Sequence, residues 1–123
     1  MESYERDARE STIIEKLTEL TKTGELEWDG INEDNAGVTK YLVPDASISI
    51  SFFGSTVENA VAIVIYIASM SIIIHMSDNI ISSSDKQRLV KELYSSINPK
   101  KKITYEKEEE IKFNEAEKKI GIK

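Results

Sequence analysis

The most apolar part of the chain is the segment 60–76, AVAIVIYIASMSIIIHM. If this segment is extended, both of its faces are apolar, which is typical of a strand covered on two sides or lying at the centre of a sheet. The interruption Ser69-Met70-Ser71 favours two antiparallel strands with a turn near Met70, although the turn contains no Gly, Asn or Pro. One long, bent strand is the alternative.

A membrane-spanning helix is the competing interpretation of this segment. Such a helix needs roughly 20 predominantly apolar residues and usually has cationic flanks. Here the run is shorter, contains Ser69, Ser71 and His75, and has no Lys or Arg close on either side. The charged N-terminus also lacks the apolar region of a secretory signal. We therefore expect a soluble, cytoplasmic protein that does not bind membranes.

The segment 46–53 shows the clearest strand pattern. Ile48, Ile50 and Phe52 alternate with serines, which predicts one face on the core and one face toward water or a partner. Because the serine side is small and only lightly polar, we expect this strand to lie at an edge of the sheet, where it invites pairing. The preceding segment 38–43 alternates weakly and is interpreted as another strand.

The segment 25–29 also alternates. Leu26 and Trp28 share one face of an extended chain and three carboxylates share the other, which predicts a half-buried strand with Trp28 inward. The following residues, 30–37, have the composition of a loop.

Four apolar residues at helical spacing predict a first helix over 11–23, and Gly24 follows where a glycine commonly ends a helix. Its start is open between a capping box at Thr12 and an earlier start near Ser3. The stripe consists of Ile13, Ile14, Leu17 and Leu20.

A second helix is predicted over 84–97. Ser84 and Gln87 have the spacing of a capping box, and Pro99 lies just past the expected end. The apolar stripe is formed by Leu89, Val90, Leu93, Tyr94 and Ile97.

These elements predict an α+β fold, with an antiparallel sheet of about five strands covered by the two helices. We assign residues 1–103 to a single domain and residues 104–123 to a charged C-terminal helical tail. Pairs such as Glu108–Lys112 stand at i, i+4, as on a solvent-exposed helix.

The tail has only a thin apolar seam, so we expect it to dock weakly or on another subunit. Together with the serine-lined strand, this favours a homodimer, since two-fold pairing is the commonest closed assembly. A monomer with a frayed tail is the alternative. The seam consists of Tyr105, Phe113, Ala116 and Ile120.

Composition narrows the choice of function. The chain has 123 residues, enough for one domain with a core, and no cysteine, which excludes disulfides and thiolate chemistry. The formal net charge is −6, with 13 acidic and five basic residues in the segment 1–58. This balance argues against nucleic acid as a partner. The only basic run, 100–102, is interpreted as a solvent-exposed turn after Pro99.

Residues that could carry chemistry are few. His75 is the only histidine and stands among apolar residues, so a structural role is favoured over catalysis. Glu25, Glu27 and Asp29 could offer oxygens to a hard cation, but the following loop does not match a calcium-binding pattern. No glycine-rich phosphate loop is present. We therefore expect no enzymatic activity, no metal and no cofactor.

Two motifs carry a resemblance. The pattern L-T-x-x-G-x-L-x-W occupies 20–28, and a variant of L-x-x-L-Y-x-x-I, with Val90 for its first Leu, occupies 90–97. With the first motif before several predicted strands and the second motif after them, the chain resembles a loose group of small, uncharacterised bacterial and phage α+β proteins. The resemblance covers roughly residues 11–98. It implies a shared fold and a bacterial or phage setting, and it implies no activity.

The leading functional hypothesis is a non-enzymatic interaction protein that binds a protein partner or self-associates, in a specific version a phage-encoded inhibitor of bacterial defence. The alternative is a module that sequesters a metabolite or nucleotide signal in a pocket lined by Tyr41, Tyr66 or Tyr94. A metal-dependent hydrolase that uses the acidic face is a third hypothesis. The candidate contacts with a partner or ligand are Tyr105, Phe113, Ala116, Ile120, Tyr41 and Tyr66.

Overall fold

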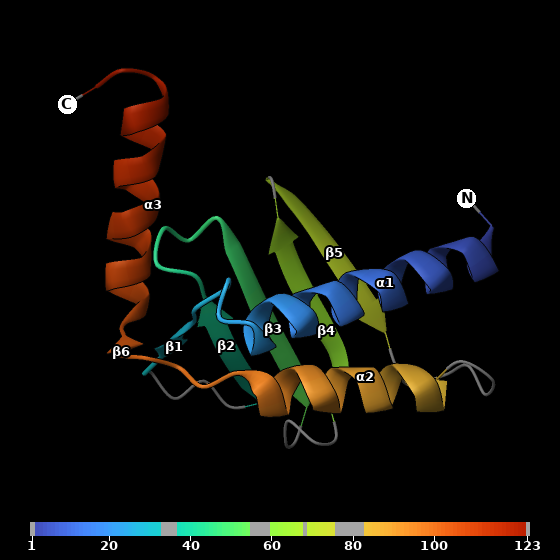
Figure 1. The fold of residues 1–123 in the computed structure, drawn as a ribbon. Coiled ribbons are helices and arrows are strands. Elements are labelled where there is room, and N and C mark those ends of the chain that lie inside the picture. The colour runs from blue at the N-terminus through green and yellow to red at the C-terminus, as the bar shows by residue number, and fades with distance from the viewer. Residues whose placement is uncertain (1, 33–36, 55–59, 68, 76–82, 123) are drawn as a thin grey trace.

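The computed structural model describes residues 2–32, 37–54, 60–67, 69–75 and 83–122. It shows an α+β fold with three helices and a six-stranded, mostly antiparallel sheet (Figure 1). In chain order the elements are α1 (Ser3–Lys22), β1 (Asp29–Ile31), β2 (Val38–Leu42), β3 (Ile48–Gly54), β4 (Ala60–Ile67), β5 (Met70–His75), α2 (Ser83–Ser96), β6 (Lys102–Ile103) and α3 (Tyr105–Lys119).

The spatial order of the strands is β5-β4-β3-β2-β1-β6. The first five strands form an antiparallel meander, in which each strand pairs with the next in sequence. After β5 the chain returns through α2 to the other side of the sheet, where β6 pairs parallel with β1. The two edges of the sheet are therefore β5 and β6.

The serine-lined strand β3 is not an edge strand. It pairs with β2 on one side and with β4 on the other, so the prediction of an edge over 46–53 is wrong. The faces of the strand are as expected: Ile50 and Phe52 lie in the core, while Ser51 on the opposite face is half-buried. Alternation identifies which face is buried, but it does not identify the neighbouring strands.

The predicted hairpin within 60–76 is confirmed. β4 and β5 pair antiparallel from Ile67 opposite Met70 to Ala62 opposite His75. The described turn residue, Ser69, has φ 65°. A two-residue hairpin needs positive φ in its loop, which glycine and asparagine supply most easily. Serine fills this position here, so the turn lacks the usual sequence signal.

Helices α1 and α2 pack on one face of the sheet (Figure 1). α1 starts at Ser3, the earlier of the two expected starts. Thr12 therefore lies inside the helix, where its hydroxyl donates to the Ala8 carbonyl, 2.8 Å away. Gly24, with φ 83°, follows the end of the helix as predicted. The start of α2 at Ser83 agrees with the predicted region, but the side chains at 83–85 lie outside the described residues.

The predicted strand over 25–29 is wrong, because strand β1 begins only at Asp29 and continues into the segment expected to be a loop. The backbone before β1 remains close to the end of α1: the amide of Leu26 donates to the carbonyl of Leu20, 3.0 Å away. Trp28 is nevertheless buried, with 1% of its surface exposed, and its Nε1–H donates to Thr21 Oγ1 over 3.0 Å.

Strand β6 is absent from the sequence interpretation. The run 100–102 was expected to be a solvent-exposed turn, but its backbone pairs with β1. The amide of Lys100 donates to the carbonyl of Trp28 and the amide of Gly30 donates to the carbonyl of Lys101. These hydrogen bonds place α3 beside the β1–β6 edge (Figure 1).

Helix α3 docks on its own domain, on the sheet face opposite α1 and α2. Ile111 packs against a small cluster that includes Leu42 and Ile103. Beside this cluster Lys40 Nζ lies 2.7 Å from Glu108 Oε2, an ion pair that lacks the directionality of a hydrogen bond. Glu108 is 5% exposed, so the side chain expected on a solvent-facing surface is in fact buried.

We expect Trp28→Ala to lower the free energy of unfolding by about 3–5 kcal/mol, the range for truncating a large aromatic side chain in a core. Urea denaturation followed by circular dichroism measures this change. Trp28→Phe is the control. It keeps much of the aromatic volume while it loses the hydrogen bond to Thr21, so its cost should be smaller. Native indole fluorescence typical of full exposure to water would contradict the burial of Trp28.

Candidate functional site

The candidate site is the edge strand β5. Among the described residues β5 pairs only with β4. In a two-residue hairpin the residues that flank the turn exchange hydrogen bonds, and the pattern then alternates. Met70, Ile72 and Ile74 therefore direct their backbone groups toward β4. The backbone groups of Ser71 and Ile73 point away from the sheet and are positioned to pair with another chain.

A groove lies between this edge and α1. Its volume is about 500 Å³, within the range of binding pockets. α1 contributes Arg6, Arg9, Glu10 and Ile13, which recur at helical spacing on one side of the helix, and β5 contributes residues 70–73. Hydrophobic side chains and arginines thus line the same groove, directly beside the unpaired backbone of β5.

Lys86 of α2 determines the charge of this groove. It is 5% exposed, its Nζ donates to Glu10 Oε1 over 2.7 Å, and it forms a second ion pair with Asp7. Burial acts to lower the pKa of Lys86, but the two carboxylates outweigh burial and raise the pKa above its ordinary value. Lys86 and the two carboxylates together carry a formal charge of −1, so Lys86 offsets the charge of Glu10 only in part.

Arg6 and Arg9 remain as the cationic groups of the groove. Both side chains are exposed, and neither forms an ion pair within the described part of the chain. Guanidinium groups bind carboxylates through paired hydrogen bonds. The groove therefore carries positive charge available to a partner, although the chain as a whole has a net charge of −6.

Large apolar side chains are exposed along the same strand. Met70 is 62% exposed and Ile73 is 55% exposed. Met70 lies on the face covered by the helices, as its register with Ile67 shows, whereas Ile73 lies opposite Val64 on the other face. An added strand could therefore bury apolar surface on both faces of the sheet.

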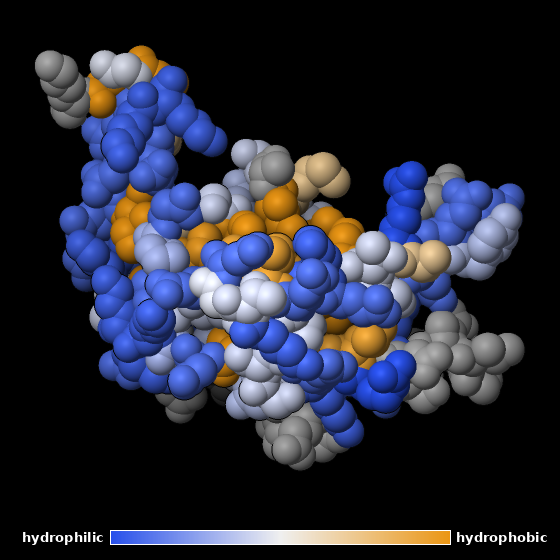
Figure 2. Space-filling model, in the orientation of Figure 1, coloured by the Kyte–Doolittle hydropathy of each residue, from blue (hydrophilic) through white to orange (hydrophobic). Residues whose placement is uncertain are grey.

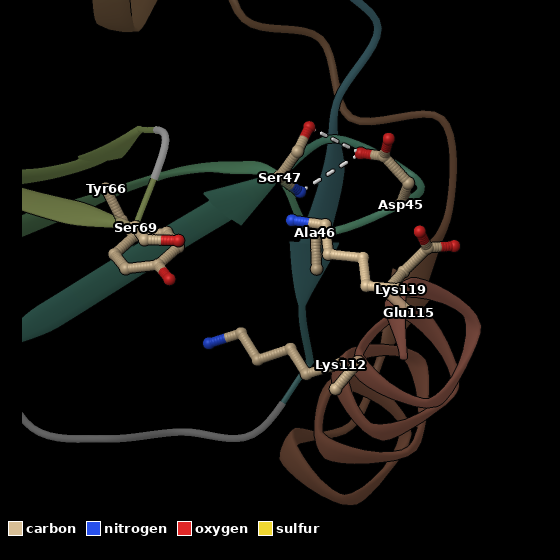
Figure 3. A pocket seen from close by; sticks show the side chains of 9 residues that line it. Asp45, Ala46, Ser47, Tyr66, Ser69, Lys112, Glu115 and Lys119 are labelled. Carbon is tan, nitrogen blue, oxygen red and sulfur yellow. Dashed lines mark hydrogen bonds between the residues drawn. The ribbon is translucent and has the colours of Figure 1, made fainter. Parts of the chain in front are cut away.

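A second pocket lies between α3 and the sheet (Figure 3). Its volume is about 430 Å³, and Figure 3 shows Lys112, Glu115 and Lys119 of α3 opposite Tyr66 and the turn before β3. Lys112 Nζ is 5.6 Å from the centre of the Tyr66 ring, a cation–π distance.

The charges of this second pocket largely have partners within the protein. Lys112 lies 3.3 Å from Glu108, and Glu115 lies 3.8 Å from Lys118. Hydrogen bonds from Ser47 to Asp45 hold the pKa of that carboxyl below its usual value, despite a small opposing effect of burial. These pairings leave less unbalanced charge for a ligand than the groove beside β5 does.

The tyrosines named for a ligand pocket, Tyr41, Tyr66 or Tyr94, lie in two separate places. Tyr41 and Tyr94 pack against Phe52 in the core beneath α2, with ring centres 5.7–6.3 Å apart. Burial and the neighbouring Tyr94 raise the pKa of Tyr41 to about 12. Tyr66 lies on the opposite face of the sheet, in the pocket beneath α3.

The predicted seam of the tail is divided. Tyr105 is half-buried near Lys40, and Ala116 lines the pocket beneath α3. Phe113 and Ile120 are 62% and 74% exposed. Ile120 directly follows the last residue of α3, and the surface of α3 that Figure 2 shows is mostly hydrophilic. Self-association through Phe113 and Ile120 stays a prediction.

The other candidates for chemistry are placed as follows. The side chain of His75 lies outside the described residues. Glu25 and Glu27 are exposed, and Lys100 Nζ lies 2.8 Å from Glu27 Oε1, whereas Asp29 is 3% exposed. The expected carboxylate face is therefore not formed. No group of three potential metal ligands comes together in the ranges that the structure describes.

Comparisons with protein-family models, with curated proteins and with solved structures found no match. Within the described residues, no helix combines the length and the apolar character needed to span a membrane.

The sequence interpretation did not identify β5 as a candidate site, because it expected the serine-lined strand at the edge of the sheet. A signal was present: Met70-Ser71-Ile72-Ile73-Ile74-His75 contains no Lys, Glu or Pro. Such residues are the usual protection of an edge strand against pairing.

We expect Lys86→Met to lower the free energy of unfolding by roughly 1–3 kcal/mol, because it leaves Glu10 buried without its cation. The pKa of Lys86 is raised in the folded state. Its stabilising effect is therefore complete below the ordinary lysine pKa and is lost as pH rises through the folded-state value. The difference in unfolding free energy between parent and variant should shrink above about pH 10.5. Urea melts between pH 7 and 11 measure it, and a constant difference would contradict this role.

Proposed function

We propose that this chain is a non-enzymatic interaction protein that binds a protein partner by accepting an extended segment of that partner beside β5. The observation that carries the proposal is the unpaired edge of β5 next to a groove lined by α1. In strand addition, backbone hydrogen bonds supply affinity and alternating side-chain pockets supply specificity. β5 and the groove offer both features together.

The exposed apolar side chains support the same function. Large apolar groups on an edge strand are a liability for a monomer, since they favour unspecific pairing. Met70 and Ile73 place such groups on both faces at the edge. A partner strand would cover them and complete the sheet. The resemblance to bacterial and phage proteins adds the specific proposal that the partner is a bacterial defence protein, inhibited when one of its segments is captured.

The alternative is a small ligand in the pocket beneath α3, favoured by the Lys112–Tyr66 contact. This pocket supports the proposal less well, because its lysines and carboxylates lie close to opposite charges of the same domain. A ligand would have to compete with those partners. In the groove beside β5, Arg6 and Arg9 carry no such described pairing.

The test uses peptides selected from a displayed library of random ten-residue sequences. We expect selected peptides to lose at least about tenfold in affinity for Ile73→Pro, because proline removes the outward N–H of β5, and for Ile73→Lys, because lysine blunts edge pairing. Fluorescence anisotropy measures the dissociation constants.

The matched control is Ile120→Lys, which makes the same change at an exposed isoleucine just past the C-terminal end of α3, outside the groove. This variant should bind like the parent. Thermal melts verify that all three variants are folded. Equal affinity of the parent and both folded Ile73 variants, or a library that yields no binder, would contradict strand addition at β5.

A further inference from the structure

We infer that the segment accepted by β5 is a single acidic strand of a different protein, with carboxylates near Arg6 and Arg9 and apolar side chains along the rest of the groove. This inference rests on the proposed function and specifies the chemistry of its partner.

The position of α1 determines where an added strand lies. α1 crosses over β5, and its N-terminal half extends past the edge of the sheet (Figure 1). A strand added to β5 would lie about 4.8 Å from it in the plane of the sheet. It would therefore run beneath the projecting part of α1, and every second side chain would point into the groove.

The groove has two chemically distinct parts. Ile13 of α1 and Ile72 of β5 are apolar and suit an aliphatic side chain. Arg9 and Arg6 stand about one and two turns nearer the N-terminus of α1 than Ile13, on the same side of the helix. The third charged group of the groove, Glu10, shares Lys86 with Asp7. Together with the two arginines, these groups carry a net charge of +1, which favours carboxylates on the incoming segment.

The other face of the added strand meets a different surface. Ile73 points to the face of the sheet not covered by α1 and α2 and is 55% exposed. A β-branched or aromatic side chain opposite Ile73 would bury it, as in cross-strand pairs of natural sheets. The matching segment therefore alternates apolar residues and carries acidic residues near one end.

A second copy of this chain does not fit the same edge. Two-fold antiparallel pairing of two β5 strands would place both α1 helices on one face, because a two-fold axis normal to the sheet preserves its faces. The projecting N-terminal halves would then compete for the same space above the new strand pair, and their arginines would approach each other. The net charge of −6 on each copy adds long-range repulsion.

The test uses three fluorescein-labelled ten-residue peptides with a common core of alternating Thr and Val. The ends are Glu-Glu, Gln-Gln or Lys-Lys, and both ends are alike so that strand direction does not matter. We expect the Glu peptide to bind about five- to tenfold more tightly than the Gln peptide, and the Lys peptide to bind most weakly, as two exposed ion pairs allow. The preference should shrink between 50 and 500 mM salt, roughly in line with charge screening.

Charge-reversal variants test whether the two arginines cause the preference for acidic peptides. Arg6→Glu combined with Arg9→Glu should invert the ranking of the peptides, and the milder pair Arg6→Gln and Arg9→Gln should abolish it. The matched control combines Lys91→Glu and Lys101→Glu, two exposed lysines outside the groove, and makes the same change in net charge. This control should keep the ranking of the parent.

Each contrary outcome has a distinct meaning. Equal binding of the three peptides, with loss of binding in Ile73→Pro, would overturn the acidic segment while strand addition stands. A charge ranking that survives in Ile73→Pro would show unspecific attraction and overturn both proposals. Failure of all three peptides to bind at 1 mM, while library-selected peptides bind at β5, would overturn the acidic segment alone. If the parent sediments as a dimer and Ile73→Pro sediments as a monomer, the segment paired with β5 is a second copy of this chain, and the acidic segment of a different protein is overturned.

Discussion

The connection through α2 determines which edge of the sheet remains open. Five strands are laid down as a meander in chain order, so the last of them, β5, remains an edge unless a further strand pairs with it. The chain does not add another described strand beside β5. It crosses the helical face as α2 and pairs β6 with β1 at the far side. This single crossing extends one edge, brings α3 to it, and leaves β5 facing the groove under α1.

Buried charges fix the helix layers on both faces of the sheet. Lys86 joins α2 to two carboxylates of α1, and Lys40 of the sheet meets Glu108 of α3. Buried ion pairs add little net stability, because desolvation offsets most of the attraction, but they strongly disfavour arrangements in which either partner is left alone. Their main effect here is therefore positional. Lys86 holds the helix that roofs the groove and at the same time pairs with Glu10 within it.

The local pattern of the sequence predicts the faces of the sheet well. Alternation in β3 places Ile50 and Phe52 in the core, and the doubly apolar segment 60–76 is indeed a hairpin of two strands. What it cannot predict is pairing between distant segments. Strand β6 is two residues long and exists because the backbone around Lys101 meets that of Gly30, a contact across about seventy residues that leaves no periodicity.

The candidate site was missed for the same reason. Whether a strand lies at the edge or at the centre of a sheet depends on its neighbours in space. The small serines of β3 suggested an edge, although β2 and β4 pair with it on both sides. The burial of Glu108 likewise could not be inferred from the sequence. Its i, i+4 partner Lys112 suggested a solvent-facing pair, while Lys40, its closest cation, comes from a strand far away in sequence.

The two edges of the sheet differ in a way that bears on function. β6 is short, includes Lys102 and has α3 beside it, so it has the features that normally discourage pairing. β5 is six residues long, carries Met70 and Ile73 exposed, and has no charged residue or proline. Its only described cover is α1, which projects above the edge. Under the proposed function, an apolar edge roofed by arginines would exclude bulky two-layer partners and admit a single strand, and such selectivity is what a binding site requires.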